Sequence, residues 1–317
     1  MTLFDNHMHI INEATTPPEI AAGRWEISTA EMRAIMGLAH LARGIDWPDE
    51  LDAAADIIDE VMMLMPRYRR IRQLIALYFM TIPQQVKLIR RMLAENGVAG
   101  ANVLLIPGTP SAAIDATLLA CAGTELRVYV SWIHADKAGV AGIKHYPSFC
   151  PSAPLSMISD TACALDLPII SHCSRGGVRD PDISEAMAKG LNTPGRWLDE
   201  VRDRPIRLCL AHAGGGSWAR NLASKRVPTP WTLDYMMREA HPPTEWAGRL
   251  WVDTAFHDDQ GGERYRRAVM RAGAPWRVLW GSDWPLHLPQ WSYAQACEWG
   301  RAYWGDQIAA QAEFAGR

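Results

Sequence analysis

Short apolar runs, separated by longer stretches with a helical pattern, recur along most of the chain. Most of these runs are rich in β-branched residues and are bounded by glycine, proline or charged residues. The eight runs cover residues 2–9, 100–107, 126–134, 141–147, 167–173, 206–213, 249–255 and 276–285. Runs of this length and composition are typical of parallel strands that are buried on both faces. Residues 83–96 illustrate the helical pattern, and Gly97 suits the position that follows a helix.

This alternation of strands and helices predicts the α/β class with a parallel sheet. Eight strands predict that the sheet closes into a (β/α)8 TIM barrel. The alternative is an open, doubly wound sheet, which usually has a glycine-rich phosphate loop after its first strand. No such loop follows residues 2–9, so we favour the closed barrel.

Residues 11–78 interrupt the alternation because they contain no clear strand pattern. They contain three helical stretches instead: 29–42 after a cap signal at Ser28 and Thr29, 50–65, and the basic stretch 67–77. We expect a helical insertion after the first strand. It could form a lid over the barrel mouth, a contact between subunits of a homo-oligomer, or extra packing around the barrel.

Charge and composition exclude some classes of partner. The chain has 32 basic and 35 acidic residues, a net charge of −3, and 48% of its residues are hydrophobic. Such a balance argues against binding to nucleic acid or to a membrane surface through bulk charge, and it leaves a small-molecule substrate as the expected partner. No apolar run reaches the roughly 18–20 residues that a membrane helix needs.

The six cysteines are scattered and form no CxxC pair. Several lie in apolar runs, so we expect reduced core residues of a cytoplasmic protein and no disulfide framework. We also expect no signal peptide, because the first apolar run reaches His7 and His9 too early to form one.

Side chains of the types that bind metals recur at the C-terminal ends of the predicted strands. His7 and His9 are two residues apart on the first strand, so both can face the same ion. Alone, this pair is a weak signal, but His172, His212 and Asp283 follow the fifth, sixth and eighth strands. That end of a TIM barrel carries the active site. Imidazole and carboxylate ligands together suit zinc, manganese, iron or nickel better than magnesium or calcium.

In this arrangement the chain resembles the amidohydrolase superfamily. The resemblance rests on His7-Met8-His9, His172, His212 with its following glycines, and the motif Trp280-Gly281-Ser282-Asp283-Trp284-Pro285. The last motif is similar to the branch that holds metal-dependent decarboxylases and lactonases. The resemblance covers nearly every barrel strand but not residues 11–78. It implies a single metal-dependent, amidohydrolase-like barrel over residues 1–317, with 11–78 as a helical insertion, and it does not specify the reaction.

The resemblance implies a role for each of these residues. His7 and His9 would bind the first metal together with Asp283, which would also take a proton from the reacting water. His172 would be a metal ligand in one-metal and two-metal members. His212 would bind a second metal in two-metal members and act as the catalytic acid or base in several one-metal members. The expected cofactor is one or two divalent ions, Zn²⁺ first and Mn²⁺ as the alternative.

Lys144 stands near the end of the fourth predicted strand. In two-metal hydrolases of the superfamily, a lysine on this strand is carboxylated by carbon dioxide and bridges the metals. Carboxylation needs a neutral amine, so the pocket would have to lower the lysine pKa. Alternatively, Lys144 stays an ammonium group that pairs with a carboxylate or holds a substrate carboxylate. Related one-metal members also have a lysine in a similar Gly-Ile-Lys context, so both alternatives stay open.

Residues near other strand ends are candidates for binding the substrate. Arg175 follows His172 by three residues and could pair with a substrate carboxylate. Trp132, His134, Tyr146 and His257 follow the third, fourth and seventh strands and could line the mouth. Asp253, at the end of the seventh strand, could instead be a structural hydrogen-bond acceptor.

Three functions are compatible with this pattern. The full set of ligand positions favours a metal-dependent hydrolase that uses activated water on a small-molecule lactone, ester or amide. The alternative is a non-oxidative, metal-dependent decarboxylase of an aromatic or unsaturated carboxylic acid, with Arg175 as the carboxylate anchor. A barrel that binds metal or ligand without turnover is the third, and the intact ligand set argues against it.

Overall fold

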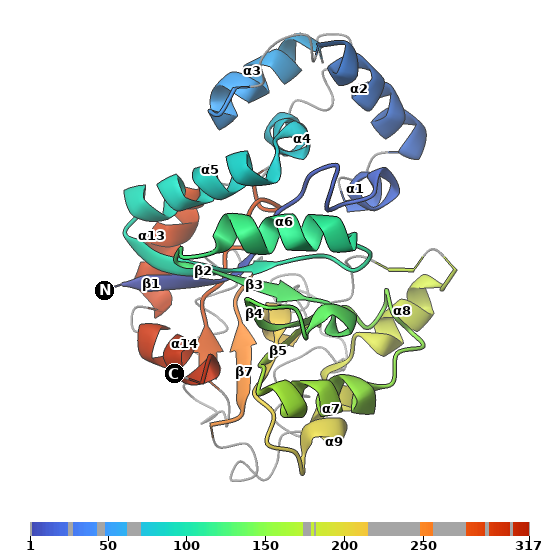
Figure 1. The fold of residues 1–317 in the computed structure, drawn as a ribbon, viewed down its shortest axis with the longest axis vertical. Helices are drawn as coiled ribbons and strands as arrows, with labels where there is room; N and C mark the ends of the chain where they lie inside the picture. Colours follow the sequence, from blue (N-terminus) through green and yellow to red (C-terminus); the bar gives the residue numbers. More distant parts are fainter. Residues whose placement is uncertain are drawn as a thin grey trace, which may run out of the picture.

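The computed structural model describes residues 2–24, 28–42, 48–61, 71–173, 179–180, 182–214, 248–255, 277–288, 292–304 and 307–316. Its centre is an eight-stranded sheet in which neighbouring strands follow the chain order and all pairs are parallel. The strands are β1 (Leu3–Met8), β2 (Val98–Leu104), β3 (Leu126–Val130), β4 (Val140–His145), β5 (Ile169–Ser171), β6 (Leu208–Leu210), β7 (Leu250–Asp253) and β8 (Arg277–Leu279). The eight predicted strands are therefore confirmed (Figure 1).

Backbone contacts between β1 and the segment after β8 close the sheet into a barrel. The amide of Asn6 donates to the carbonyl of Trp280 over 2.9 Å, and the amide of His9 donates to the carbonyl of Trp284 over 2.7 Å. Met8 and Trp284 form a parallel bridge at the same place. The protein is thus a (β/α)8 TIM barrel, as the alternation of strands and helices predicts.

The described helices lie between the strands in sequence, with α1 to α5 in the segment between β1 and β2 and α13 and α14 after β8. They are α1 (Pro18–Arg24), α2 (Thr29–Ala42), α3 (Leu51–Val61), α4 (Arg72–Phe79), α5 (Ile82–Glu95), α6 (Ser111–Cys121), α7 (Leu155–Leu165), α8 (Glu185–Leu191), α9 (Pro194–Val201), α13 (Tyr293–Trp304) and α14 (Gln307–Phe314). Phe314 of α14 packs against Trp251 inside the barrel, with ring centroids 5.2 Å apart. Because α14 also contacts the start of β8 through an Arg277–Glu313 ion pair, it covers the end opposite the mouth.

Several observed strands are shorter than the predicted runs because the chain changes conformation soon after the strand begins to end. Short 3-10 helices start almost directly after two strands, Trp132–His134 after β3 and Ala211–Gly214 after β6. The chain therefore leaves the hydrogen-bonded ladder sooner than the apolar pattern indicates. The helix predicted at 83–96 is α5, and Gly97 follows it with a φ of 57°, the left-handed conformation expected of a residue after a helix.

The predicted helical insertion is present between β1 and β2. Its predicted helix 29–42 is α2, 50–65 corresponds to α3, and 67–77 corresponds to α4 with later bounds, while residues 62–70 lie outside the described part. The buried faces of α2, α3 and α4 belong to the same hydrophobic core as the barrel helices. The segment is also tied to the barrel by hydrogen bonds, such as that from the Thr109 hydroxyl to the carbonyl of Thr15.

The N-terminal helix α1 lies near α2 (Figure 1) and contacts residues that follow two barrel strands. Its Ile20 packs with Ile106, Tyr146 and Phe149, which follow β2 and β4. Ile20 of α1 therefore lies beside residues that follow β2 and β4, and the role of the insertion stays a prediction. No described helix is long and apolar enough to cross a membrane.

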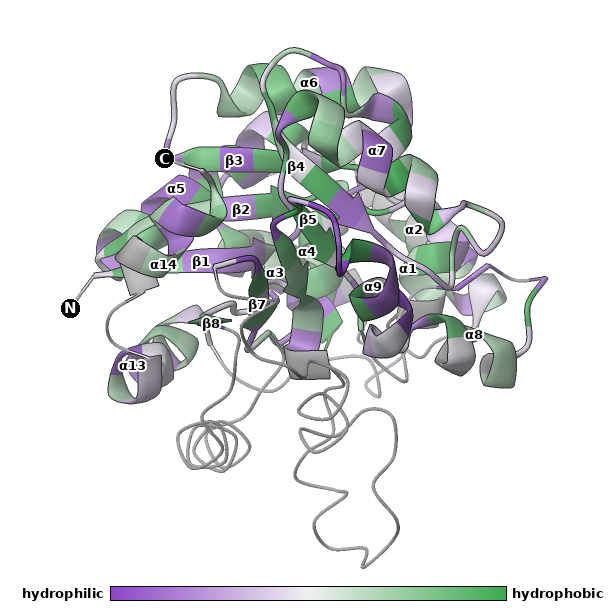
Figure 2. Ribbon diagram, turned by 90° about the horizontal axis from the view of Figure 1, so that it is seen from below, coloured by the Kyte–Doolittle hydropathy of each residue, from purple (hydrophilic) through white to green (hydrophobic). Residues whose placement is uncertain are grey.

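The first strand differs from its neighbours in polarity. Figure 2 shows β5 and β7 as largely hydrophobic, whereas much of β1 is hydrophilic. This polarity comes from Asp5, Asn6 and His7, and yet every residue of β1 is buried. Buried polar groups need hydrogen-bond partners, so this strand must receive partners from elsewhere in the fold.

A substitution of Gly142 in β4 would test how tightly the barrel wall is packed. A methyl group there would lie closer to the ring of Tyr129 than real Cβ contacts allow, and Tyr129 is fully buried. We expect Gly142→Ala to lower the free energy of unfolding by about 1–3 kcal/mol, measured by urea denaturation. The control is Gly37→Ala in α2, where a methyl group meets nothing within 4 Å. That variant should be neutral or stabilised by up to about 1 kcal/mol. Equal effects of both substitutions would contradict this account.

Candidate metal centre

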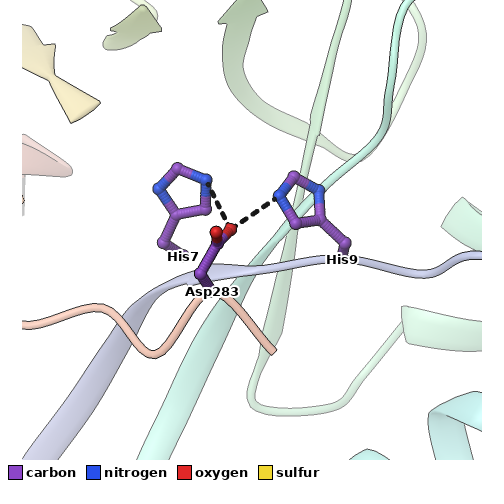
Figure 3. A group of neighbouring side chains, drawn as sticks. All are labelled: His7, His9 and Asp283. Atoms are coloured by element: carbon purple, nitrogen blue, oxygen red, sulfur yellow. Dashed lines mark ion pairs between the residues drawn. The ribbon is translucent and has the colours of Figure 1, made fainter. Parts of the chain in front are cut away.

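Three buried side chains converge at the barrel mouth (Figure 3). The Nε2 atoms of His7 and His9 lie 3.5 Å and 3.2 Å from Oδ1 of Asp283. Among the described residues, these three form the group of His, Cys, Asp and Glu side chains whose ligand atoms are close enough to share a metal ion. Two of them come from the end of β1 and the third from the segment after β8, so barrel closure brings them together.

Close backbone approach places Asp283 beside the two histidines. A methyl group on Gly281 would lie 2.7 Å from Cβ of His7, so a glycine is needed where the two segments meet. Asp283 has a φ of 60°, a left-handed conformation that non-glycine residues seldom adopt. Its amide donates to the carbonyl of His7 over 2.8 Å, which stabilises this conformation.

A buried carboxylate behind the ligands holds the same two segments. Oδ1 of Asp5 accepts the backbone N–H groups of His7, over 3.1 Å, and of Ser282, over 3.0 Å. Its other oxygen accepts the hydroxyl of Tyr293 over 3.1 Å. Burial raises the pKa of Asp5 to about 6, while these hydrogen bonds act in the opposite direction. Our sequence reasoning missed Asp5, although an acidic residue inside a buried strand is a signal in itself.

The partners of the other ring nitrogens determine how the two histidines are protonated. Nδ1 of His7 lies 2.8 Å from Oδ2 of Asp253, and Nδ1 of His9 lies 2.8 Å from the carbonyl oxygen of Leu104. Both partners can only accept in these pairs, provided that Asp253 is ionised, so each Nδ1 carries the proton. Each Nε2 then directs a lone pair toward Asp283. Histidines that bind metals usually donate their other ring N–H to a carboxylate or carbonyl oxygen in this way.

The three ligand atoms fit a divalent ion. With metal–ligand bonds of about 2.0–2.1 Å and tetrahedral angles, two ligand atoms stand about 3.4 Å apart. The observed separations of 3.2 Å and 3.5 Å agree with this value. Two lone pairs and a carboxylate oxygen would also repel one another without a cation between them.

Burial keeps His7 and His212 neutral. It lowers the pKa of His7 well below its ordinary value, and Lys144 and His212 act in the same direction. Burial also lowers the pKa of His212 to about 4, although Asp283 opposes this shift. Neutral imidazoles are the form that binds metals, so the environment prepares these side chains for that role. Burial raises the pKa of Asp253 above its ordinary value, although Lys144 and the nearby backbone N–H groups oppose this shift.

The other predicted site residues lie next to these three. Nζ of Lys144 is 3.5 Å from Nε2 of His7 and 4.8 Å above the ring of Tyr146. Nε2 of His212 is 3.2 Å from Nδ1 of His172, and the rings of His7 and His212 are 5.0 Å apart. The structure therefore brings together all six residues predicted to bind metal, and their roles as ligands stay predictions.

The residues predicted to bind substrate have different positions. Tyr146 is 1% exposed and stacks on His172 with ring centroids 5.4 Å apart, and its role in binding substrate stays a prediction. Trp132 and His134 are partly exposed in the 3-10 helix after β3. Within the described ranges, no hydrogen bond, ion pair or ring contact joins either residue to the metal centre. Arg175 and His257 lie outside the described residues.

Comparison with known proteins agrees with this class of fold and site, a (β/α)8 barrel with a His–His–Asp group at its mouth. The sequence profile of the family described as Amidohydrolase matches residues 5–303. The chain therefore belongs to the amidohydrolase family, as the sequence resemblance implies. Members of this family typically bind a divalent metal, and membership supports an enzyme of the metal-dependent hydrolase or decarboxylase type.

The chain also resembles solved structures. One is the crystal structure of a probable 2-pyrone-4,6-dicarboxylic acid hydrolase from Acinetobacter baumannii with citric acid bound. The two chains share 12% identity with a TM-score of 0.56, and the likeness covers 100% of each. A truncated 3-deoxy-D-arabino-heptulosonate 7-phosphate synthase from Thermotoga maritima gives a TM-score of 0.35 at 13% identity, covering 66% of this chain and 80% of that one. No curated protein matches the sequence.

Metal removal provides a test of this centre. An ion present at 100 times its dissociation constant stabilises the folded state by about 2.7 kcal/mol. We expect Zn²⁺ to raise the melting temperature of the metal-free protein by about 5 °C, and a chelator to reverse the change. The measurement is differential scanning fluorimetry. Asp283→Asn is the control, because it preserves the side-chain shape and removes the ligand charge, so the shift should shrink. An unchanged melting temperature for the wild-type protein would contradict the assignment.

Proposed function

We propose that this protein is a metal-dependent hydrolase that acts on a small-molecule lactone, ester or amide through activated water. The observation that carries this proposal is the convergence of His7 Nε2 and His9 Nε2 on the carboxylate of Asp283. A site of this kind at the mouth of an amidohydrolase barrel suits hydrolysis, because it combines a cation site with side chains that can move protons.

His7, His9 and Asp283 would hold the ion, and His172 would add a further ligand. Two or three imidazoles with one carboxylate suit Zn²⁺, with Mn²⁺ as the alternative. When bound, such an ion lowers the pKa of water toward about 7 and polarises a carbonyl group.

Two side chains are suited to proton transfer. Asp283 would take the proton from the reacting water and pass it to the leaving group, because its carboxylate faces the ligand atoms in a buried site. His212 would be the second proton carrier. Its Nδ1 lies 3.1 Å from the carbonyl oxygen of Ala255 and so carries the proton, while its basic Nε2 lies 3.2 Å from Nδ1 of His172. With a pKa near 4, it is neutral at pH 7 and so starts as a base.

Lys144 favours a one-metal site in this proposal. Its Nζ lies above the face of the Tyr146 ring, an arrangement that stabilises an ammonium group and would disfavour an anionic carboxylated lysine. The ammonium would hold an anionic group of the substrate beside the ligands. The alternative is a carboxylated Lys144 that bridges two ions, with His172 and His212 as ligands of the second.

A non-oxidative decarboxylase of an aromatic or unsaturated acid is the second candidate. The motif from Trp280 to Pro285 favours it, because this motif is similar to that of the decarboxylase branch. An ammonium group of Lys144 beside the metal ligands could anchor the carboxylate that leaves.

Substrate panels distinguish these functions. The metal-loaded protein would be incubated with lactones, esters and amides, and separately with aromatic and unsaturated acids. The lactones should include 2-pyrone-4,6-dicarboxylate, because the similar barrel is titled a probable hydrolase of this compound. We expect acid release from the first panel, measured with a pH indicator. Carbon dioxide release from the second panel would favour the decarboxylase, and inactivity on both would favour a binding protein. Asp283→Asn should lower the rate by about 10²–10⁴-fold.

Substitutions of Lys144 distinguish an ammonium group at this position from a carboxylated lysine that bridges two ions. Lys144→Ala should lower activity in either case. Lys144→Arg preserves the positive charge but cannot be carboxylated, so partial activity is expected if the ammonium acts. Metal analysis should give one ion per chain, and added bicarbonate should not change the rate. Two ions per chain, with an inactive arginine variant, would favour the bridging alternative.

A further inference from the structure

Asp253 lies between the two halves of the site and contacts both. It is the last residue of β7, and its side chain is fully buried. Its Oδ2 lies 2.8 Å from Nδ1 of His7. Its Oδ1 accepts the backbone N–H of His212 over 2.8 Å and that of Ala255 over 3.2 Å. One carboxylate thus joins a proposed metal ligand to the proposed proton carrier.

The end of β7 holds His212 at two points. The backbone of His212 has a φ of 57°, a left-handed conformation that non-glycine residues seldom adopt, and the bond from its N–H to Asp253 stabilises it. Its imidazole Nδ1 lies 3.1 Å from the carbonyl oxygen of Ala255, two residues after Asp253. The main chain and the ring of His212 are therefore both oriented from the same short segment.

We propose that Asp253 is a positioning residue that sets the proton of His7 on Nδ1 and holds His212 in its left-handed conformation. The part of this inference that concerns metal affinity rests on the proposed metal site. The part that concerns the protonation of His7 does not, because it can be measured without metal.

The substitution Asp253→Asn tests whether Asp253 sets the proton of His7 on Nδ1. The amide oxygen of asparagine can still accept the N–H groups of His212 and Ala255. Its NH₂ group would then face Nδ1 of His7, which would have to accept a hydrogen bond. The proton of His7 would move to Nε2 and remove the lone pair that binds metal. Side-chain size is almost unchanged, so the variant alters the proton and the charge but little else.

Asp5→Asn is the matched control. Asp5 is as buried as Asp253, and it also accepts two backbone N–H groups with one oxygen. Its other oxygen contacts the hydroxyl of Tyr293, which can reverse its hydrogen bond because a hydroxyl group donates and accepts. This variant therefore removes a buried carboxylate near the ligands without touching an imidazole nitrogen.

The experiment has two readouts on the full chain. The first is Zn²⁺ affinity, measured by competition with a chelator. Loss of the hydrogen-bond partner of a metal-binding histidine typically weakens metal binding about 10–100-fold. We expect this loss for Asp253→Asn and less than about a tenfold change for Asp5→Asn. The second is ¹⁵N NMR of labelled histidine in the metal-free protein, with His7 assigned through a His7→Gln variant. Wild type should show the proton on Nδ1 of His7, and Asp253→Asn should show it on Nε2.

Each outcome of these two measurements either supports or overturns the positioning role of Asp253. Wild-type metal affinity in Asp253→Asn, or an equal loss in Asp5→Asn, would overturn the role of Asp253. If Asp253→Asn does not fold, the wild-type spectrum decides, because a proton on Nε2 of His7 would overturn the inference directly. If the wild-type protein binds no Zn²⁺ but His7 has the expected protonation that changes in the variant, the proposed function fails and the positioning role stands.

Discussion

The polar side chains of β1 are buried, and the barrel is arranged so that each has a partner. Asp5, Asn6 and His7 follow one another on a strand that is buried throughout. A buried polar group that loses its hydrogen bond costs about 1–3 kcal/mol, so this strand cannot pack favourably alone. Asn6 accepts a hydrogen bond from Asn102 on β2 over 2.7 Å and contacts Cys209 on β6 across the barrel. The polar side chains of β1 thus find their partners on several other strands of the barrel.

The contacts that close the barrel also bring the residues of the site together. The backbone bonds between β1 and the segment after β8 run through the residues that carry the ligands, as in the bond from the Asp283 amide to the His7 carbonyl. The carboxylate of Asp5 and the close approach at Gly281 reinforce the same junction. Because the ligands belong to the elements that close the barrel, their geometry has the rigidity of the barrel itself. A metal ion at this junction would in turn stabilise closure.

The fold could be predicted because buried parallel strands and amphipathic helices have different periods of hydrophobicity. The spacing of hydrophobic residues indicated all eight strands and the helical insertion after β1. It also placed the histidines and Asp283 at strand ends, where topology brings them together. Spacing does not show where the chain turns after a strand ends. Trp132 and His134 lie in a 3-10 helix directly after β3, and their role in lining the mouth stays a prediction. Asp5 was missed because two of its partners, Ser282 and Tyr293, are distant in sequence.

The orientation of the site residues depends on tertiary structure in a more specific way. His212 and Asp283 both follow strands, and both have φ values near 60°. Such a conformation costs about 1–2 kcal/mol for an L-residue, so local preference opposes it. Compensation comes from the Asp253 carboxylate, which accepts the amide of His212, and from the His7 carbonyl, which accepts the amide of Asp283. Since both acceptors lie on other strands, the two side chains adopt these positions only when the barrel is assembled. The residue types that carry the chemistry can be read from the sequence, whereas their mutual orientation is a property of the closed barrel.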